Sequence, residues 1–182
     1  INNIEMIIKH TMYESEGTKL NNNEIKMEIR NAVTGIPTSK GVSKVTINNI
    51  DDKPGIASSI FLPLSEMGIS VDVIVQTAGN DGKTNLSFTL NDNDLESCVN
   101  ELIKNNVSKK EFIKTQSGLG KVSIVGTGIQ NQPGYASRMF KTLSENKINI
   151  EMITTSEIRI TCIIKSSDLE LAAKSLHKEF IT

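Results

Sequence analysis

Tryptophan is absent from this chain of 182 residues, and only 4% of its residues are aromatic. Neither charge sign dominates, because 20 lysine and arginine residues stand against 21 aspartate and glutamate residues, a formal net charge of −1. A near-neutral chain lacks the extended basic surface that attracts nucleic acid or an anionic membrane. We therefore expect neither of these as a partner.

Long hydrophobic runs are missing as well. No apolar run in the sequence approaches the roughly 20 residues that a membrane-spanning helix needs, and no secretory hydrophobic region is present. We expect a soluble, cytoplasmic protein. Because the chain begins at Ile1 rather than at a methionine, we also expect it to be a piece of a longer protein.

The two cysteines are too few for a disulfide framework. Cys98 shares a helical spacing with Leu95 and Leu102, and Cys162 alternates with Ile160 along an apolar strand. Both are predicted to be small core residues. The sequence shows no metal-ligand set, no phosphate-binding loop and no nucleophile elbow, so catalysis is not indicated.

What the chain does contain is an internal repeat. The segments 44–47 and 121–124 each open a pattern of strand, Pro-Gly, amphipathic helix and strand. The second copy follows the first by 77 residues at the leading strands (121 − 44), 79 at the prolines (133 − 54) and 74 at the last helices (168 − 94). Such a small drift indicates that loops changed length while the elements stayed, and a repeat of this kind determines the fold.

Each copy is predicted to alternate strands and helices. The first copy reads strand 44–50, helix 55–67, strand 69–77, strand 83–90, helix 94–105 and strand 110–116. The second reads strand 121–127, helix 134–146, strand 148–155, strand 158–164 and helix 168–179. The second copy therefore lacks the sixth element, and a sheet without its closing strand would leave an exposed apolar edge.

A candidate for the missing strand lies upstream of both copies, at residues 27–36. We expect Pro37 and Gly41 to separate this segment from the strand that follows, and we expect it to pair with the second copy. The first copy would then be inserted within the second. A short alternating strand, Ile4–Ile8, and a polar loop precede this region and are not placed by pattern alone.

The two Pro-Gly turns are the strongest candidates for a binding site. In each copy a polar loop, Asp51 to Lys53 or Gln130 to Gln132, precedes Pro-Gly and then a helix. Proline suits the first helical position, glycine lets a ligand approach the backbone, and the free N–H groups of a helix start favour a carboxylate. Plain helix initiation is the alternative explanation.

The second strand of each copy supports a binding surface. One face of the strand after the first helix carries Ser70, Asp72 and Gln76, and the equivalent face in the second copy carries Asn149 and Glu151. Acids and amides are unusual in the middle of strands. A carboxylate at Asp72 or Glu151 is placed to receive an ammonium group.

At these residues the chain resembles the C-terminal regulatory region of aspartokinase, over residues 28–180. The resembling segments are Val33 to Ile36, Lys44 to Thr46, Asp52 to Ala57, Val71 to Gln76, Lys121 to Gly126, Asn149 to Ile153, Thr155 to Ile158, and Ala173, Leu176, His177 and Phe180. Pro-Gly alone is common to ACT domains, the small modules that bind amino acids, whereas Thr-Ser-Glu-Ile at 155–158 is specific to the aspartokinase family.

The resemblance implies an α+β fold of two ferredoxin-like βαββαβ ACT domains, the first inserted within the second. Residues 1–26 would form the end of the catalytic domain and a connector, 27–40 the strand completing the second ACT domain, 41–118 the first ACT domain and 119–182 the second. The kinase signatures are absent from this chain, so ATP and magnesium would bind in a catalytic domain outside it. We expect this chain alone not to phosphorylate aspartate.

The resemblance also implies feedback inhibition by lysine, threonine or both, bound between the ACT domains of two chains in a homodimer. Most of the implied effector pocket comes from the first copy, and a partner chain closes it with the segment around Asn149. The implied effector-binding residues are Asp52, Lys53, Pro54, Gly55, Ile56, Ala57, Ile69, Asp72, Gln76, Asn149, Ile150 and Ser156.

Two other functions stay open at this point. An RNA-recognition module shares the βαββαβ layout but needs aromatic platforms, and the third strands offer only Phe88 and, in the second copy, Cys162. A purely structural dimerisation module without a ligand response is the other alternative.

Overall fold

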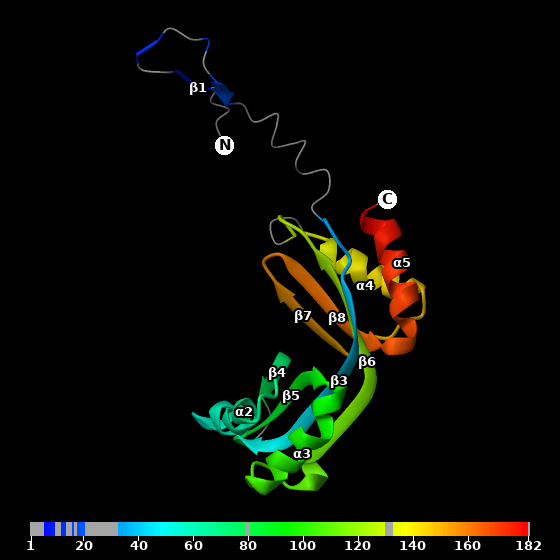
Figure 1. Cartoon of the computed structure of the whole chain (residues 1–182). Helices are drawn as coiled ribbons and strands as arrows, with labels where there is room; N and C mark the ends of the chain where they lie inside the picture. The colour runs from blue at the N-terminus through cyan, green and yellow to red at the C-terminus, as the bar shows by residue number, and fades with distance from the viewer. Residues whose placement is uncertain are drawn as a thin grey trace.

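The computed structural model describes residues 6–9, 12, 13, 16, 18–20, 33–78, 81–129 and 133–181. Near the N-terminus, β1 (Met6–Ile8) pairs antiparallel with β2 (Thr18–Leu20). The predicted strand Ile4–Ile8 is therefore seen from Met6 onward, and its first two residues lie outside the described part of the chain. The remaining strands form one sheet of six, in the order β4-β5-β3-β6-β8-β7 (Figure 1).

The elements follow the predicted repeat closely. In chain order they are β3 (Thr38–Asp51), α2 (Ile56–Glu66), β4 (Val71–Ala78), β5 (Lys83–Asn91), α3 (Leu95–Lys104), β6 (Ile113–Val125), α4 (Tyr135–Glu145), β7 (Met152–Ser156), β8 (Arg159–Lys165) and α5 (Leu169–Phe180). Short 3₁₀ turns precede α3, β6 and α5. The α+β fold of antiparallel sheet and helices is thus confirmed.

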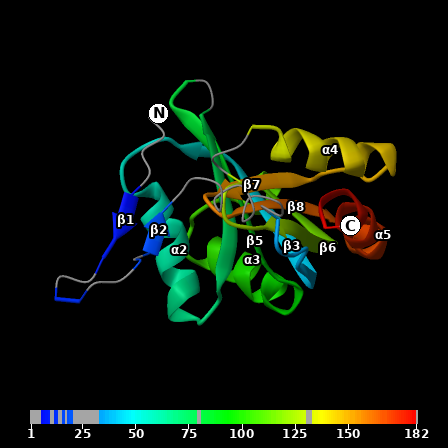
Figure 2. The ribbon, with the colours of Figure 1, turned by 90° about the horizontal axis from the view of Figure 1, so that it is seen from above.

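The chain forms two units, each with its own core. In the first unit, α2 and α3 cover one face of β4, β5 and the adjoining parts of β3 and β6; in the second, α4 and α5 cover one face of β7, β8 and the rest of β6 (Figures 1 and 2). The helices bury the apolar stripes that the 3.6-residue period predicts. The first core contains Val45, Ile47, Ile60, Leu64, Leu86, Phe88, Cys98 and Leu102, and the second contains Val122, Ile124, Met139, Leu143, Cys162, Ile164, Ala172 and Leu176.

The predicted break at Gly41 is wrong. Strand β3 runs without interruption from Thr38 to Asp51 and serves both units, and β6 likewise joins the predicted strands 110–116 and 121–127 into one. Gly41 and Gly118 both take positive φ, 73° and 70°, where the paired strands change register. Glycine tolerates this conformation, so the chain bends there while keeping its ladder.

The second unit gains a fourth strand from upstream sequence. Residues 38–42 of β3 pair with 119–122 of β6, and Gly35 forms a bridge to Val125. This pairing is compatible with the predicted insertion of the first unit within the second, and the insertion itself stays a prediction. Of the predicted strand 27–36, only residues 33–36 lie within the described part of the chain, and Thr34 and Gly35 among them bond to Val125 as predicted. Most of the pairing is made by the residues that follow, 38–42. The proposed domain boundaries themselves stay a prediction.

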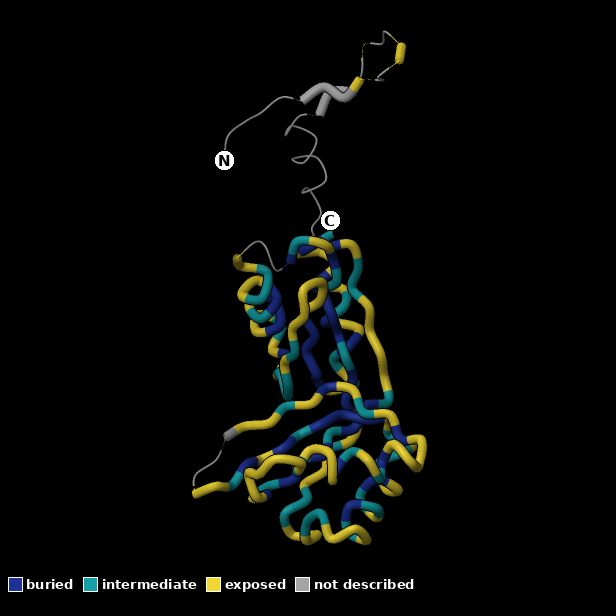
Figure 3. The backbone as a smooth tube through the Cα atoms, turned by 90° about the vertical axis from the view of Figure 1, so that its left-hand side faces the viewer, coloured by how far each residue is buried: buried dark blue, intermediate teal, exposed yellow. Residues whose placement is uncertain are grey.

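The uncovered faces of the two units meet where β3 and β6 pass between them. A small cluster of buried residues, Val42, Val73, Leu119 and Ile163, lies at this junction. Figure 3 shows that buried backbone follows the strands through both halves, with exposed residues on the helices and turns. Removing these apolar groups from water stabilises the junction by about 25 cal/mol per Å².

Candidate functional site

The start of α2 is open in the way that the Pro-Gly motif predicts. Gly55 occupies the N-cap position with φ 91° and no side-chain cap. Residues from Asp52 to Gly55 are exposed, as is Ala57 in the first turn. Because the first N–H groups of a helix lack intrahelical partners, this end presents donors and a positive dipole to a pocket.

That pocket, which we call the helix-start pocket, has a volume of about 600 Å³. It brings together four of the predicted effector-binding residues: Lys53, Pro54, Gly55 and Ile56. Asp51 and Lys83 also line it and form an ion pair at 2.5 Å. A hydrogen bond and the charge of Lys83, together with the charge of Lys53, hold the pKa of the Asp51 carboxyl below its usual value.

The second unit repeats the geometry of the helix start. Gly134 is the N-cap of α4, again with positive φ, 107°, and no side-chain cap. The polar loop Gln130 to Gln132 predicted to precede it lies outside the described residues. Both units therefore contain a helix that begins at a glycine without a side-chain cap.

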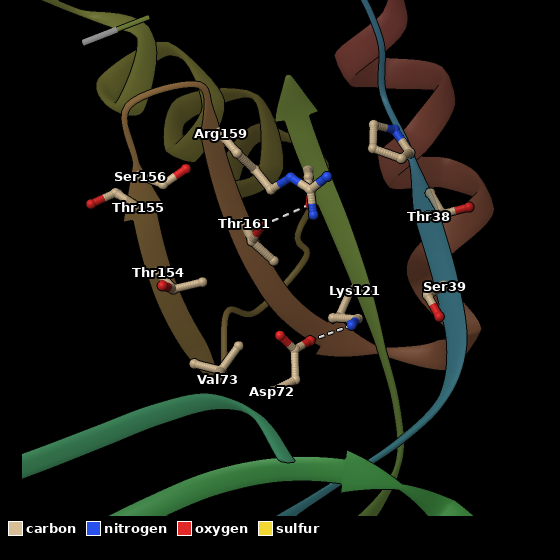
Figure 4. A pocket seen from close by; sticks show the side chains of 12 residues that line it. Thr38, Ser39, Asp72, Val73, Lys121, Thr154, Thr155, Ser156, Arg159 and Thr161 are labelled. Carbon is tan, nitrogen blue, oxygen red and sulfur yellow. Dashed lines mark hydrogen bonds and ion pairs between the residues drawn. The ribbon is translucent and has the colours of Figure 1, made fainter. Parts of the chain in front are cut away.

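Two other predicted site residues, Asp72 and Ser156, lie in a different pocket. This inter-unit pocket, of about 280 Å³, lies between the edge of the first unit and the uncovered sheet face of the second (Figure 4). Asp72 forms an ion pair with Lys121 there. The remaining lining residues are Pro37, Thr38, Ser39, Val73, Ser123, Thr154, Thr155, Arg159 and Thr161.

Asp72 and Glu151, the two acids predicted to bind an ammonium group, are each paired with a lysine side chain of this same chain. Asp72 binds Lys121, and Glu151 lies 3.4 Å from Nζ of Lys44. Burial raises the pKa of Glu151, but hydrogen bonds from Gln116 and Asn149 and the charge of Lys44 outweigh it, so that this pKa is lowered. Asn149 donates to Glu151 at 3.3 Å.

Within a single chain, the remaining predicted site residues do not line the helix-start pocket. Ile69 is buried in the first core, and Ile150 packs against the second. Gln76 is exposed on β4, opposite Leu86. The sequence prediction assigned Asn149 and Ile150 to a partner chain, so the set as a whole stays a prediction.

The prediction overlooked the cations and hydroxyls of the inter-unit pocket. Ser123, Arg159 and Thr161 point to the uncovered face of the sheet, whereas Val122 and Ile160 point to the core. The signal was present as alternation of polar and apolar residues along 121–125 and 159–164. It became meaningful only once these strands were known to be neighbours.

The two cysteines lie where the sequence predicts. Cys98 and Cys162 are fully buried core residues, as predicted, and burial raises the pKa of each thiol to about 12. No group of three potential metal ligands exists among the described residues. None of the described helices is long and apolar enough to cross a membrane. Phe88 is buried against Phe61 and is unavailable for stacking on RNA bases.

Comparison with known proteins agrees with this geometry. The sequence pattern of the ACT domain family matches residues 45–105 and 122–180, which are the two repeats. This chain belongs to the ACT domain family.

Similar proteins and solved structures indicate which group of ACT-domain proteins this chain resembles. Aspartokinase of Pseudomonas aeruginosa is 37% identical over 98% of this chain. The regulatory subunit of aspartate kinase from Thermus thermophilus superposes with a TM-score of 0.74 and 32% identity, covering 82% of this chain and 99% of that subunit. Aspartokinase III of E. coli shares the fold at a TM-score of 0.65 and 19% identity, covering 84% of this chain and 34% of that one.

The resemblance to the aspartokinase regulatory region is therefore confirmed. These tandem ACT domains span less than half of the curated relatives that they match, 44% in the case of the P. aeruginosa protein.

Proposed function

We propose that these ACT domains bind lysine, threonine or both and thereby mediate feedback inhibition of an aspartate kinase, which converts ATP and L-aspartate to 4-phospho-L-aspartate. The observation that carries the proposal is the uncapped start of α2 at the mouth of a pocket of about 600 Å³. An amino acid's carboxylate suits the free N–H groups there. Asp51, exposed in the same pocket and paired there with Lys83, can accept its ammonium group in place of that lysine.

The fold is compatible with this ligand class. The E. coli aspartokinase III that shares the fold was solved in complex with lysine and aspartate. Which amino acid binds here depends on residues that read the effector side chain. We assign that role to Gln76, with Asn149 and Ile150 contributed by a second copy of the chain.

A homodimer is proposed because, within the described residues, the six-stranded sheet ends in two edge strands that have no further strand beside them. Strands β4 and β7 are terminal in the sheet. Ile74 and Ile153 occupy equivalent positions of the repeat on these strands and are 49% and 43% exposed. Pairing of edges between two copies would satisfy the backbone and cover these side chains.

Coupling to catalysis would pass through the kinase domain, which lies outside this chain along with its ATP and Mg²⁺ sites. An effector that binds one arrangement of the dimer more tightly than the other shifts the population toward that arrangement. The size of the shift, and of the change in kinase activity, depends on the difference between the two affinities. Allosteric coupling of this kind amounts to about 1–3 kcal/mol. We expect the assembled enzyme to act in the cytoplasm.

Calorimetric titration of the chain with lysine and with threonine tests the proposal. We expect heat of binding with at least one of them, and stabilisation of about 2.7 kcal/mol at 100 times the dissociation constant. Gln76→Ala should weaken binding by about tenfold, because it removes the hydrogen bond that Gln76 is proposed to make to the effector side chain. Asn100→Ala, which removes an exposed amide on α3, is the matched control.

If a folded, dimeric chain gives no heat of binding with either amino acid, the effector proposal is wrong. A dimerisation module would then be the remaining function. Binding that is equally strong in Gln76→Ala would place the effector away from β4.

A further inference from the structure

The uncovered face of the second unit carries a second candidate site, built around Arg159. Three neighbouring strands present polar side chains to the inter-unit pocket in rows: Ser123 lies opposite Thr161, and Thr161 lies opposite Thr154. Arg159 lies opposite Ser156 at the end of the pocket away from Lys121 (Figure 4). The lining is therefore almost entirely hydroxyls and charges.

Arg159 differs from the other cation of this pocket in having no partner. Lys121 is held by Asp72. Among the described residues, Arg159 makes no hydrogen bond or ion pair, and its side chain is exposed. In Figure 4 the guanidinium group extends over the pocket beside Thr161 rather than away from it. The pocket thus has a free, directed positive group at one end.

The first unit provides an internal comparison. Its hydroxyl pair Thr46 and Ser87, 2.9 Å apart, corresponds by repeat position to Ser123 and Thr161, 2.8 Å apart. The position equivalent to Arg159 is Asn85, whose side chain accepts a hydrogen bond from the backbone of Asn49. The two uncovered faces share their hydroxyls, and the free guanidinium is specific to the second.

We propose that the inter-unit pocket binds the oxyanion group, carboxylate or phosphate, of a small hydrophilic molecule. A guanidinium group binds either oxyanion through two parallel hydrogen bonds. The hydroxyl of Ser156 supplies a further donor, and the hydroxyl of Thr161 supplies another when Ser123 donates to it. Asp72 at the far end disfavours a second negative charge, so the ligand carries its charge at the Arg159 end. This site is distinct from the helix-start pocket and adds to the proposed effector function.

Two-dimensional ¹⁵N NMR titration of the chain tests the site, with inorganic phosphate and with glycolate as probes and sodium chloride holding the ionic strength constant. We expect saturable shifts of the Arg159 side-chain N–H and of the Ser156 and Thr161 amides with at least one probe. Saturation by phosphate alone, by glycolate alone or by both identifies the group that the site prefers. Shifts that are absent or do not saturate with both probes would overturn the proposal.

Two variants, one inside the pocket and one outside it, test whether Arg159 is responsible for the binding. Arg159→Gln should raise the dissociation constant at least about tenfold, the usual effect of losing a charge-assisted hydrogen bond. Lys165→Gln removes one positive charge from the other end of β8, outside the pocket, and should change it by less than about twofold. Equal binding by wild type and Arg159→Gln would overturn the assignment.

The same spectra separate this site from the effector site. Dispersed amide signals establish that each variant is folded. Titration with lysine or threonine reports on the Gly55 amide, so failure of the effector proposal leaves the oxyanion result interpretable, and the reverse also holds.

Discussion

Lys44 of the first unit and Glu151 of the second form an ion pair, with Nζ and Oε2 3.4 Å apart. Its counterpart is the pair of Lys121 and Asp72. Lys44 and Lys121 are equivalent positions of the repeat, and so are Asp72 and Glu151. Each unit's leading strand therefore supplies a lysine to an acid of the other unit, Asp72 on β4 or Glu151 directly before β7. These two ion pairs, Lys44 with Glu151 and Lys121 with Asp72, connect the units in both directions, and we call them the clasp.

A double-mutant cycle should detect this clasp. Lys44→Met and Glu151→Gln, alone and combined, should give a coupling of about 1 kcal/mol in the free energy of unfolding by urea. The expectation rests on side chains that are only 19% and 18% exposed, since fully exposed pairs contribute about 0.2–1 kcal/mol. The control is Lys174 with Glu170 on α5, an exposed pair one helical turn apart, expected at about 0.3–0.5 kcal/mol. Equal coupling in both cycles would argue against a clasp.

Acid should weaken the protein partly through Glu151. Its pKa in the folded chain lies below the ordinary value of 4.5, so the unfolded chain binds the proton more readily. The stabilisation is therefore present above pH 4.5 and is lost as the pH falls through the folded pKa. Urea unfolding between about pH 6 and pH 3 should show a smaller loss of stability for Glu151→Gln than for wild type. Glu145→Gln, at an exposed position on α4, should follow wild type; a parallel decline in all three would contradict the prediction.

The two thiols should be inert in the native protein. With a pKa of about 12, roughly one thiol in 10⁴ is ionised at pH 8, and the thiolate is the reactive form. We expect no reaction of either cysteine with Ellman's reagent until guanidinium unfolds the chain. Ser144→Cys places an exposed thiol on α4 and should react at once. Rapid labelling of wild type would show that the cores open readily.

The edge strands should control association. Ile74→Lys and Ile153→Lys put a charge on each terminal strand and should raise the dimer dissociation constant at least about tenfold, because charged side chains oppose pairing of edges. Sedimentation equilibrium measures this constant. Leu171→Lys, at a position 48% exposed on α5, is the control and should leave it unchanged. A monomeric wild type, or dimers that tolerate both edge variants, would exclude the edges as the interface.

The elements and their cores were predictable because they depend on local periodicity. Residues such as Ile60 and Leu64 recur at helical spacing, and Ile160, Cys162 and Ile164 alternate along a strand, so each pattern determines which face is buried. The Pro-Gly starts at Gly55 and Gly134 were predictable for the same reason, since proline and glycine restrict or free the backbone at their own positions.

The continuity of β3 and β6 was not predictable in this way. A glycine in a strand pattern indicates either a break or a bulge, and Gly41 was assigned to a break. The choice depends on a neighbouring strand, here β6 with its own bend at Gly118. Only long-range pairing decides between the two.

By itself, the sequence determined that this protein is a duplicated α+β unit with an open helix start in each copy, because repeats, apolar periods and Pro-Gly turns act over a few residues. Tertiary structure alone decided that the copies share strands, that Lys44 meets Glu151 and that Arg159 faces Asp72 across one pocket. Those partners are separated by up to about a hundred residues, and only the folded sheet determines which of them come within reach of one another.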